Sequence, residues 1–330
     1  MGFENLFSKS KFVSVLNEYP ITFYDIGTRG GLDPDLGPIA FGVDAVGFEP
    51  DPVEFSRLNH EPAGPWRSSK VLPFAIGDTI GRRTLHIPSE PEGASLLPPL
   101  QGLPPRLFKK QYFCIRKIIE VDTVTLQHVI DDAGEAPPDC LKIDIEGLEL
   151  GVLSSSLKIL NNLMTVKIEV MYERLRKKQP VAHQIEAFMS ENGFILMDLI
   201  KPAHWRTNGY KLHPHMSNEA IPYSRGQLIQ GDYLFFRNYD GKNTGRYLSE
   251  AQILKLVMLS MSYGYFDYAA DILNHDETKS VLANQDVNGL LNSLSECSRR
   301  YGRLTARREC FNHLRLLGPF IRQFQDLVLR

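Results

Sequence analysis

Short apolar runs alternate with stretches of helical periodicity through the first two thirds of the chain. The runs typical of buried strands are Ile21–Gly27, Ala45–Glu49, Val71–Ile76, Leu141–Ile145, Val166–Val170, Phe194–Leu199 and Tyr233–Phe236. Apolar residues with helical spacing occur at Pro52–Asn59, Thr125–Asp132, Leu148–Leu160 and Val181–Asn192. This βαβ rhythm predicts an α/β fold with a mostly parallel, seven-stranded sheet that helices cover on both faces.

Three further segments depart from this rhythm. Residues 5–18 have amphipathic spacing, which predicts a short N-terminal helix that ends before Pro20. The proline-rich run Leu85–Pro105 and the polar run 201–225 predict two long loops over the sheet, which we expect to act as lids or binding loops. The predicted organisation is an N-terminal helix (1–20), an α/β domain (21–240) and a C-terminal region (247–330).

The C-terminal region contains helical periodicity and no predicted strand. Its run MLSMSYGYFDYAADIL predicts a helix–turn–helix pair with Gly264 at the turn, and it resembles a single tetratricopeptide unit. One such unit cannot bury its own apolar face. We therefore expect an appendage for oligomerisation, as in a homodimer, or for partner docking, with peptide recognition as an alternative.

Composition narrows the class of protein. With 37 basic and 39 acidic residues the net charge is -2, which gives no general reason to expect a nucleic-acid partner. The four cysteines form no CxxC pair, and no run of about 18 apolar residues predicts a membrane span. The first residues, MGFENLFSKSKF, are polar and do not form a secretory signal. A soluble cytoplasmic protein is expected.

The turn after the first predicted strand carries the first candidate chemistry. In FYDIGTRGG, Asp25, Gly27 and Gly31 have the spacing D-x-G-x-x-x-G. Glycine lets the backbone approach a ligand closely. Asp25 stands where the dinucleotide pattern G-x-G-x-x-G has its first glycine. Its carboxylate would repel a pyrophosphate and attract an ammonium group.

Acidic residues also follow the second and third predicted strands. Glu49 in VGFEPDP lies 24 residues after Asp25 (49 − 25 = 24), close to the spacing at which an acid accepts hydrogen bonds from ribose hydroxyls. A surface glutamate near a turn is the alternative. The segment VLPFAIGD would place Asp78 beside an adenine slot.

The segment CLKIDIEGLELGVL places several charges around the end of the fourth predicted strand. Asp144 should lie at the carboxyl end of that strand, where open α/β sheets bind ligands, and Glu146 follows at the turn. Glu149 suits a helix-capping role at least as well as a catalytic one. Lys142 interrupts an apolar strand, so we expect it to pair with one of these acids.

Taken together and in order, FYDIGTRGG, VGFEPDP, FAIGD, GASLL, VDTVTL and LKIDIEGLELGVL resemble the FkbM family of methyltransferases over roughly residues 21–240. The resemblance implies a class I methyltransferase fold, S-adenosylmethionine as methyl donor, and O-methylation of a sugar or natural-product hydroxyl. The cofactor-binding residues expected on this basis are Asp25, Gly27, Thr28, Arg29, Gly31, Glu49, Pro50, Ala75, Ile76, Asp78 and Asp144. The family commonly has Ala-Asn at the positions of Thr28 and Arg29, so Arg29 could pair with the methionine carboxylate or change that contact.

Asp144 is the first candidate for a general base that activates the acceptor hydroxyl. Glu146, and Glu169 near the end of the fifth strand, come next. His204 or His213 could reach in from the 201–225 loop, although a solvent-facing histidine is the simpler interpretation for each. A divalent metal could assist, but no complete ligand set is evident and none is predicted.

Two other functions remain open at this point. One is a protein that binds S-adenosylmethionine or a partner without turnover, because fold alone does not establish function. The other is a nicotinamide-dependent oxidoreductase, which Asp25 disfavours. The acceptor could be a sugar, a lipid-linked glycan or a small natural product.

Overall fold

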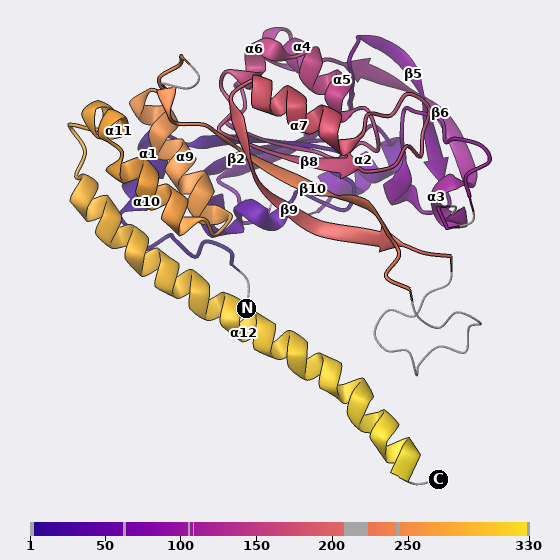
Figure 1. Ribbon diagram of the computed structural model, residues 1–330. Helices are drawn as coiled ribbons and strands as arrows, with labels where there is room; N and C mark the ends of the chain where they lie inside the picture. The colour runs from indigo at the N-terminus through magenta and orange to yellow at the C-terminus, as the bar shows by residue number, and fades with distance from the viewer. Residues whose placement is uncertain are drawn as a thin grey trace.

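The computed structural model describes residues 3–61, 64–104, 106–107, 109–207, 224–241 and 245–328, with side chains described as far as residue 312. Its centre is a seven-stranded sheet with the order β3-β2-β1-β7-β8-β10-β9 (Figure 1). The strands are β1 (Ile21–Ile26), β2 (Val43–Phe48), β3 (Ser68–Leu72), β7 (Cys140–Ile143), β8 (Thr165–Met171), β9 (Phe194–Trp205) and β10 (Gln227–Arg237). β10 runs antiparallel to both of its neighbours, and the other pairs are parallel. The predicted mostly parallel sheet is confirmed.

The central strands are apolar because helices cover both of their faces. Four helices lie over one face: α4 (Leu126–Asp131), α5 (Glu149–Ser154), α6 (Leu157–Leu160) and α7 (Ala182–Glu191). Their apolar residues share one buried cluster with alternate residues of the strands, including Ile26 and Ile143. β1 is therefore buried along almost its whole length, and its carboxyl end is held at a fixed position in the sheet.

Elements from both ends of the chain cover the opposite face. α1 (Phe12–Glu18), the 3-10 helix η1 (Pro34–Gly42), α9 (Glu250–Ser262) and α10 (Phe266–Asn274) pack there (Figure 1). Phe23 and Phe236 of the sheet share a buried cluster with Leu254 and Val257 of α9. The first part of the C-terminal region thus completes the core of the sheet.

The described residues from 250 to 328 form helices, as predicted. α9 and α10 are the expected helix–turn–helix pair, with Gly264 at φ +92° between them. After α11 (Asp276–Val281), α12 (Val287–Val328) extends past the body of the protein (Figure 1). Leu290, Leu294 and Cys297 are buried against that body, and residues 306–312 are exposed. Whether α12 meets a partner or a second copy stays a prediction.

A second, three-stranded sheet with the order β4-β6-β5 was not predicted. It consists of β4 (Ala75–Ile76), β5 (Gly81–Pro88) and β6 (Ile115–Val124). The predicted strand Val71–Ile76 is divided between β3 and β4, with Pro73 at the break, where proline offers no N–H to a ladder. The predicted loop Leu85–Pro105 begins inside β5, because β6 supplies antiparallel partners for Leu85–Pro88 that lie 27 to 34 positions away in sequence.

Other boundaries also differ from the predictions. Residues 201–205, predicted as a loop, continue β9 because β10 pairs with them. The N-terminal helix is confined to α1, and turns precede it. The predicted helix Leu148–Leu160 is two short helices, α5 and α6. α2 (Pro52–Asn59) begins and ends as predicted, with Asp51 accepting a hydrogen bond from the Val53 N–H at its N-cap.

Candidate active site

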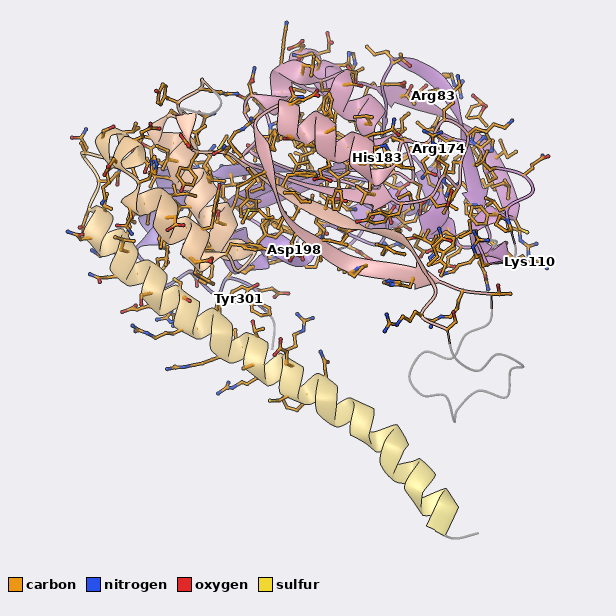
Figure 2. All side chains as sticks on the ribbon, viewed as in Figure 1. Arg83, Lys110, Arg174, His183, Asp198 and Tyr301 are labelled. Carbon is orange, nitrogen blue, oxygen red and sulfur yellow. The ribbon has the colours of Figure 1, made fainter. Side chains whose placement is uncertain are left out.

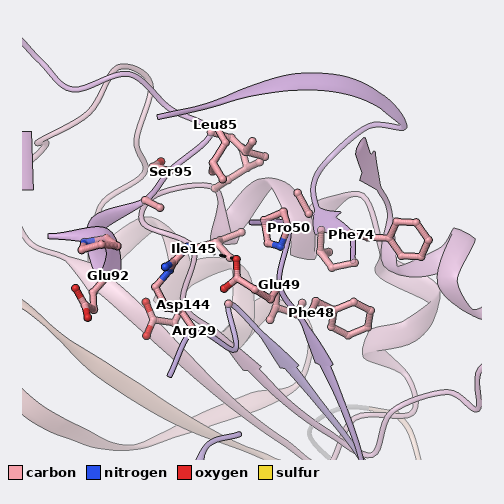
Figure 3. A pocket seen from close by; sticks show the side chains of 18 of the residues that line it. Arg29, Phe48, Glu49, Pro50, Phe74, Leu85, Glu92, Ser95, Asp144 and Ile145 are labelled. Carbon is pink, nitrogen blue, oxygen red and sulfur yellow. Dashed lines mark ion pairs between the residues drawn. The ribbon is translucent and has the colours of Figure 1, made fainter. Parts of the chain in front are cut away.

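One pocket lies where the turns after β1, β2 and β7 meet β4, at the carboxyl edge of the main sheet (Figure 3). Including the open space at its mouth, it encloses about 800 Å³. The predicted site residues that line it are Gly27, Arg29, Glu49, Pro50, Ala75, Ile76 and Asp144. Residues more than 100 positions apart in sequence are thus brought together.

Gly27 occupies a position that excludes any side chain. Its φ is +86°, and a Cβ atom added there would lie 2.0 Å from the carbonyl oxygen of Asp144. The Asp144 N–H donates to Ile26 O at 3.0 Å, so the turns after β1 and β7 touch. Glycine is required because any side chain at residue 27 would separate the two turns.

Glu49 is buried at the floor of the pocket and already has protein partners. Its Oε1 accepts a hydrogen bond from the Asp51 N–H at 2.8 Å, and Nη2 of Arg29 lies 3.5 Å away. Arg29 also pairs with Asp51 at 2.9 Å. Burial raises the pKa of Glu49 to about 7, although the Asp51 hydrogen bond and Arg29 act in the opposite direction. Arg29 therefore contacts the acid that was expected to bind ribose (Figure 3).

Lys142 joins the turns after β1 and β7 electrostatically. Its Nζ lies 3.2 Å from Oδ1 of Asp25 and 3.4 Å from Oδ2 of Asp144, which confirms the predicted pairing with an acid of its own segment. Asp25 is fully buried and also accepts from the Asp33 N–H at 2.7 Å. Burial raises the pKa of Asp25 to about 6, against the opposing effect of Lys142. The ammonium partner of Asp25 is thus a residue of the protein itself.

Glu146 and Glu149 shape the turn that carries Asp144. Glu146 has φ +60° and pairs through Oε2 with Nη2 of the buried Arg176 at 3.0 Å. Glu149 accepts from the Gly147 N–H at 2.8 Å and from the Ile145 N–H at 3.3 Å, so it holds the turn before α5. The predicted helix-capping role is not seen, because no side chain caps α5 at Leu148. Neither glutamate lines the pocket, whereas the side chain of Asp144 does and is 40% exposed.

Glu169 lies on β8 beside a group of acids. Its Oε1 accepts from Nε2 of Gln230 at 3.0 Å, while Oε2 is buried without a hydrogen-bond partner among the described residues. Burial, followed by the charges of Asp144 and Glu146, raises the pKa of Glu169 well above its ordinary value. Glu169 is therefore poised to hold a proton near the turn of Asp144.

Several predicted site residues do not reach the pocket. Thr28 is fully buried, and its hydroxyl donates to Asp25 O at 2.6 Å and accepts from the Phe48 N–H at 2.9 Å, so its side chain joins β1 to β2. Asp78 pairs instead with Arg83 at 2.6 Å. Gly31 donates to Thr28 O at 2.9 Å within the same turn. His204 is exposed on β9, and His213 lies outside the described residues.

The pocket also contains residues that sequence reasoning did not assign. They are Ile26, Phe48, Phe74, Leu85, Pro91, Glu92, Ala94, Ser95, Leu96, Lys142, Ile145 and Leu148. Ala94, Ser95 and Leu96 belong to the GASLL segment, which carried the family resemblance without an assigned role. The hydroxyl of Ser95 donates to Glu146 O at 2.9 Å and fixes this segment to the turn of Asp144. The GASLL motif was thus the sequence signal that could have identified Ala94, Ser95 and Leu96 as pocket residues.

Among the described residues, no group of three or more His, Cys, Asp or Glu side chains is arranged to hold a metal ion. Within the same part of the chain, every helix is too short or too polar to cross a membrane.

Among the comparisons with known proteins, the family model points to methyl transfer. No curated protein matches the sequence. Among solved structures, the chain is similar to a candidate RNA methyltransferase from Pyrococcus horikoshii, with 10% identity and a TM-score of 0.30, over 73% of this chain and 92% of that one. The family model of the methyltransferase FkbM domain matches residues 40–196, which include Glu49, Asp144 and Glu169. Residues 40–196 of this chain are therefore a methyltransferase FkbM domain.

Proposed function

We propose that the protein transfers a methyl group from S-adenosylmethionine to a hydroxyl group, on a class I methyltransferase fold. The observation that carries the proposal is the pocket in which Gly27, Glu49 and Asp144 converge from three strands. A cofactor at the carboxyl edge of an open α/β sheet is the general arrangement for this architecture. The FkbM domain and the antiparallel β10 inserted beside the edge strand β9 support the same assignment.

The residues of the pocket fit the parts of this cofactor. Phe74, Ala75 and Ile76 offer an apolar surface for adenine. Glu49 offers a carboxylate to the ribose hydroxyls, which requires its second oxygen, because Oε1 already accepts from the Asp51 N–H. Arg29 offers a guanidinium to the methionine carboxylate if its ion pair with Asp51 opens.

When bound, S-adenosylmethionine supplies an electrophilic methyl group on a sulfonium. Asp144 would accept the proton of the acceptor hydroxyl. The hydroxyl oxygen would then form the new bond to the methyl carbon, and the sulfur would keep the electron pair of the carbon–sulfur bond that breaks. Lys142 holds Asp144 in place through its 3.4 Å ion pair. Gly27 lets the turn that carries Asp144 lie against the turn after β1, which fixes where Asp144 stands in the pocket. Glu169 is the second candidate for the base.

Parallel calorimetric titrations with S-adenosylmethionine and NAD, followed by an assay for methyl release, test the proposal. We expect binding of S-adenosylmethionine alone, and turnover once an acceptor is supplied. Preferential binding of NAD would favour the oxidoreductase. Tight binding of S-adenosylmethionine without turnover on sugar, lipid-linked glycan or natural-product acceptors would favour the non-catalytic alternative.

A further inference from the structure

A small apolar core supports one border of the pocket. Leu107, Phe113, Leu175 and Trp205 are buried in it together with Met171 and Ile229. Two chain segments are joined there, because the Leu100 N–H donates to Leu175 O at 2.9 Å and the Lys177 N–H donates to Pro98 O at 3.0 Å. The segments around residues 98–113 and 171–178 are thus fixed to the ends of β8, β9 and β10.

Lysine and arginine residues lie on the solvent side of this core. We define the basic rim as Arg106, Lys109, Lys110, Arg174, Lys177 and Lys178. Residues 93–119 and 174–185 contain no Asp or Glu, although the whole chain has a net charge of -2. Figure 2 shows Lys110 at the end of the molecule opposite α9, α10 and α11, and Arg174 nearer the middle of the same half. The charge of the chain is therefore distributed unevenly, with a local excess of cations here.

Most cations of the rim are exposed and available to a ligand. Lys110, Arg174, Lys177 and Lys178 are exposed and form no ion pair within the described residues. Lys109 lies 4.2 Å from the centre of the Trp205 ring, and Arg106 donates to Oε1 of Gln227 at 3.1 Å. Glu90, Glu92 and Glu173 flank the rim, but its six cations outnumber these three acids. Like charges repel one another, so a polyanion would relieve the repulsion among the remaining cations.

The rim adjoins one wall of the pocket, formed by a short helix between the two. The 3-10 helix η2 (Pro91–Gly93) contributes Pro91 and Glu92 to the pocket wall and packs against α3 (Lys110–Phe113). The Glu90 N–H donates to Gln111 O at 2.9 Å, and Nη2 of Arg176 donates to Gly93 O at 2.8 Å. Arg176 also holds Glu146, two residues after Asp144. A molecule that reaches Asp144 can thus extend over the rim.

We propose that the basic rim binds a phosphate or diphosphate group of the methyl acceptor, so that the substrate is a phosphorylated hydroxyl compound. This inference rests on the proposed function, because it identifies the substrate class of the same site. Lysine and arginine bind phosphate through charge-assisted hydrogen bonds, and several cations suit a group that carries more than one negative charge.

The rim does not have the surface of a single-stranded nucleic-acid site. Such sites stack bases on accessible aromatic rings. In this part of the described structure, Phe113 and Trp205 are 8% and 4% exposed, and Trp205 contacts Phe113 edge-on and Tyr112 at a tilt instead. The charge of the rim is thus better matched to a small phosphorylated molecule.

Binding of inorganic pyrophosphate to the full-length protein tests the site without an acceptor. In the variant Lys110→Glu/Arg174→Glu we expect the affinity to fall about tenfold or more, the effect of losing at least one charge-assisted hydrogen bond. A second variant, Lys177→Glu/Lys178→Glu, should show the same loss. The matched control is Arg303→Glu/Arg307→Glu, because these residues are exposed on α12 and their replacement changes the net charge equally.

The outcomes separate the rim from the proposed function. Loss in both rim variants and retention in the control supports the proposal, and S-adenosylmethionine affinity should stay unchanged in all three. Equal loss in the control, or wild-type affinity in the rim variants, would overturn it. Rim-dependent binding of an RNA oligonucleotide that is much tighter than that of pyrophosphate or a sugar phosphate would also overturn it. Pyrophosphate binding without S-adenosylmethionine binding would contradict the proposed function alone.

Discussion

The buried acids in the two halves of the carboxyl edge of the main sheet differ in their hydrogen-bond and ion-pair partners. On the β1–β2 half, Glu49 and Asp25 each have a backbone N–H donor and a cation nearby. On the β8–β10 half, Glu169 has a buried oxygen without a hydrogen-bond partner among the described residues, and its strongest electrostatic neighbours are other carboxylates. The first half therefore resembles a preformed binding site. The second half contains Glu169, a carboxyl group that its surroundings favour in the protonated form.

The largest effect is expected where the two halves meet, at Asp144. Asp144→Asn preserves the shape of the side chain but removes its basicity, so turnover should fall about 10²–10⁴-fold, the contribution typical of a general base. Affinity for S-adenosylmethionine, measured by calorimetry, should stay within a few-fold of wild type because a base acts mainly in the transition state. A parallel collapse of affinity would make Asp144 a binding residue and leave Glu169 as the base.

The second-largest effect is expected at Glu49, on the β1–β2 half, and concerns the affinity for S-adenosylmethionine. Glu49→Gln should weaken S-adenosylmethionine binding by about 1–3 kcal/mol, because a buried hydrogen-bonding partner of the ribose is impaired. Glu61→Gln, an exposed change near the end of α2, is the control. Because the pKa of Glu49 is about 7, wild-type affinity should rise as the pH increases through 7 and the carboxylate forms. Equal affinity and equal pH profiles for wild type and Glu49→Gln would remove Glu49 from the site.

A smaller effect tests whether Thr28 supports the first half without contacting the cofactor. Thr28→Val leaves the buried Phe48 N–H without its side-chain acceptor, so the free energy of unfolding in urea should fall by about 1 kcal/mol. Thr28→Ser, which keeps the hydroxyl, should lose less. Cofactor affinity should be unchanged in both folded variants, and a large loss in Thr28→Val alone would assign a direct contact to the hydroxyl.

The smallest effect concerns the second half and depends on pH. The pKa of Glu169 is raised in the folded state above its ordinary value of 4.5, so its contribution to stability is present below that pH and is lost as the pH rises through the folded-state pKa. Gln at this position cannot ionise. The stability of Glu169→Gln relative to wild type should therefore increase between pH 5 and pH 8 in thermal denaturation, and a constant difference would show that Glu169 is not held protonated.

The same division explains what the sequence could predict. Gly27, Glu49 and Asp144 each follow an apolar strand, and parallel strands bring their carboxyl ends to one edge, so these residues were placed correctly in one pocket. Thr28 was misassigned because consecutive residues in a turn face different directions: Gly27 faces the pocket while the side chain of Thr28 is buried.

The second half depends on contacts that local patterns do not contain. Glu169 meets Gln230 through the antiparallel pairing of β8 with β10, 61 positions away. The isolation of Glu146 from the pocket results from Arg176, 30 positions away. β5 and β6 were missed because their charged and exposed positions, such as Arg82 and Lys117, obscure a strand pattern on a half-buried sheet.

The central claim is that the β1–β2 half binds S-adenosylmethionine next to Asp144. A crystal structure of the full chain with S-adenosylhomocysteine tests it most directly. The account predicts the ribose hydroxyls within hydrogen-bond distance of Glu49, the adenine against Phe74 and Ile76, and the sulfur facing Asp144. A ligand bound elsewhere, or a ribose that leaves the Glu49–Arg29 pair untouched, would contradict it.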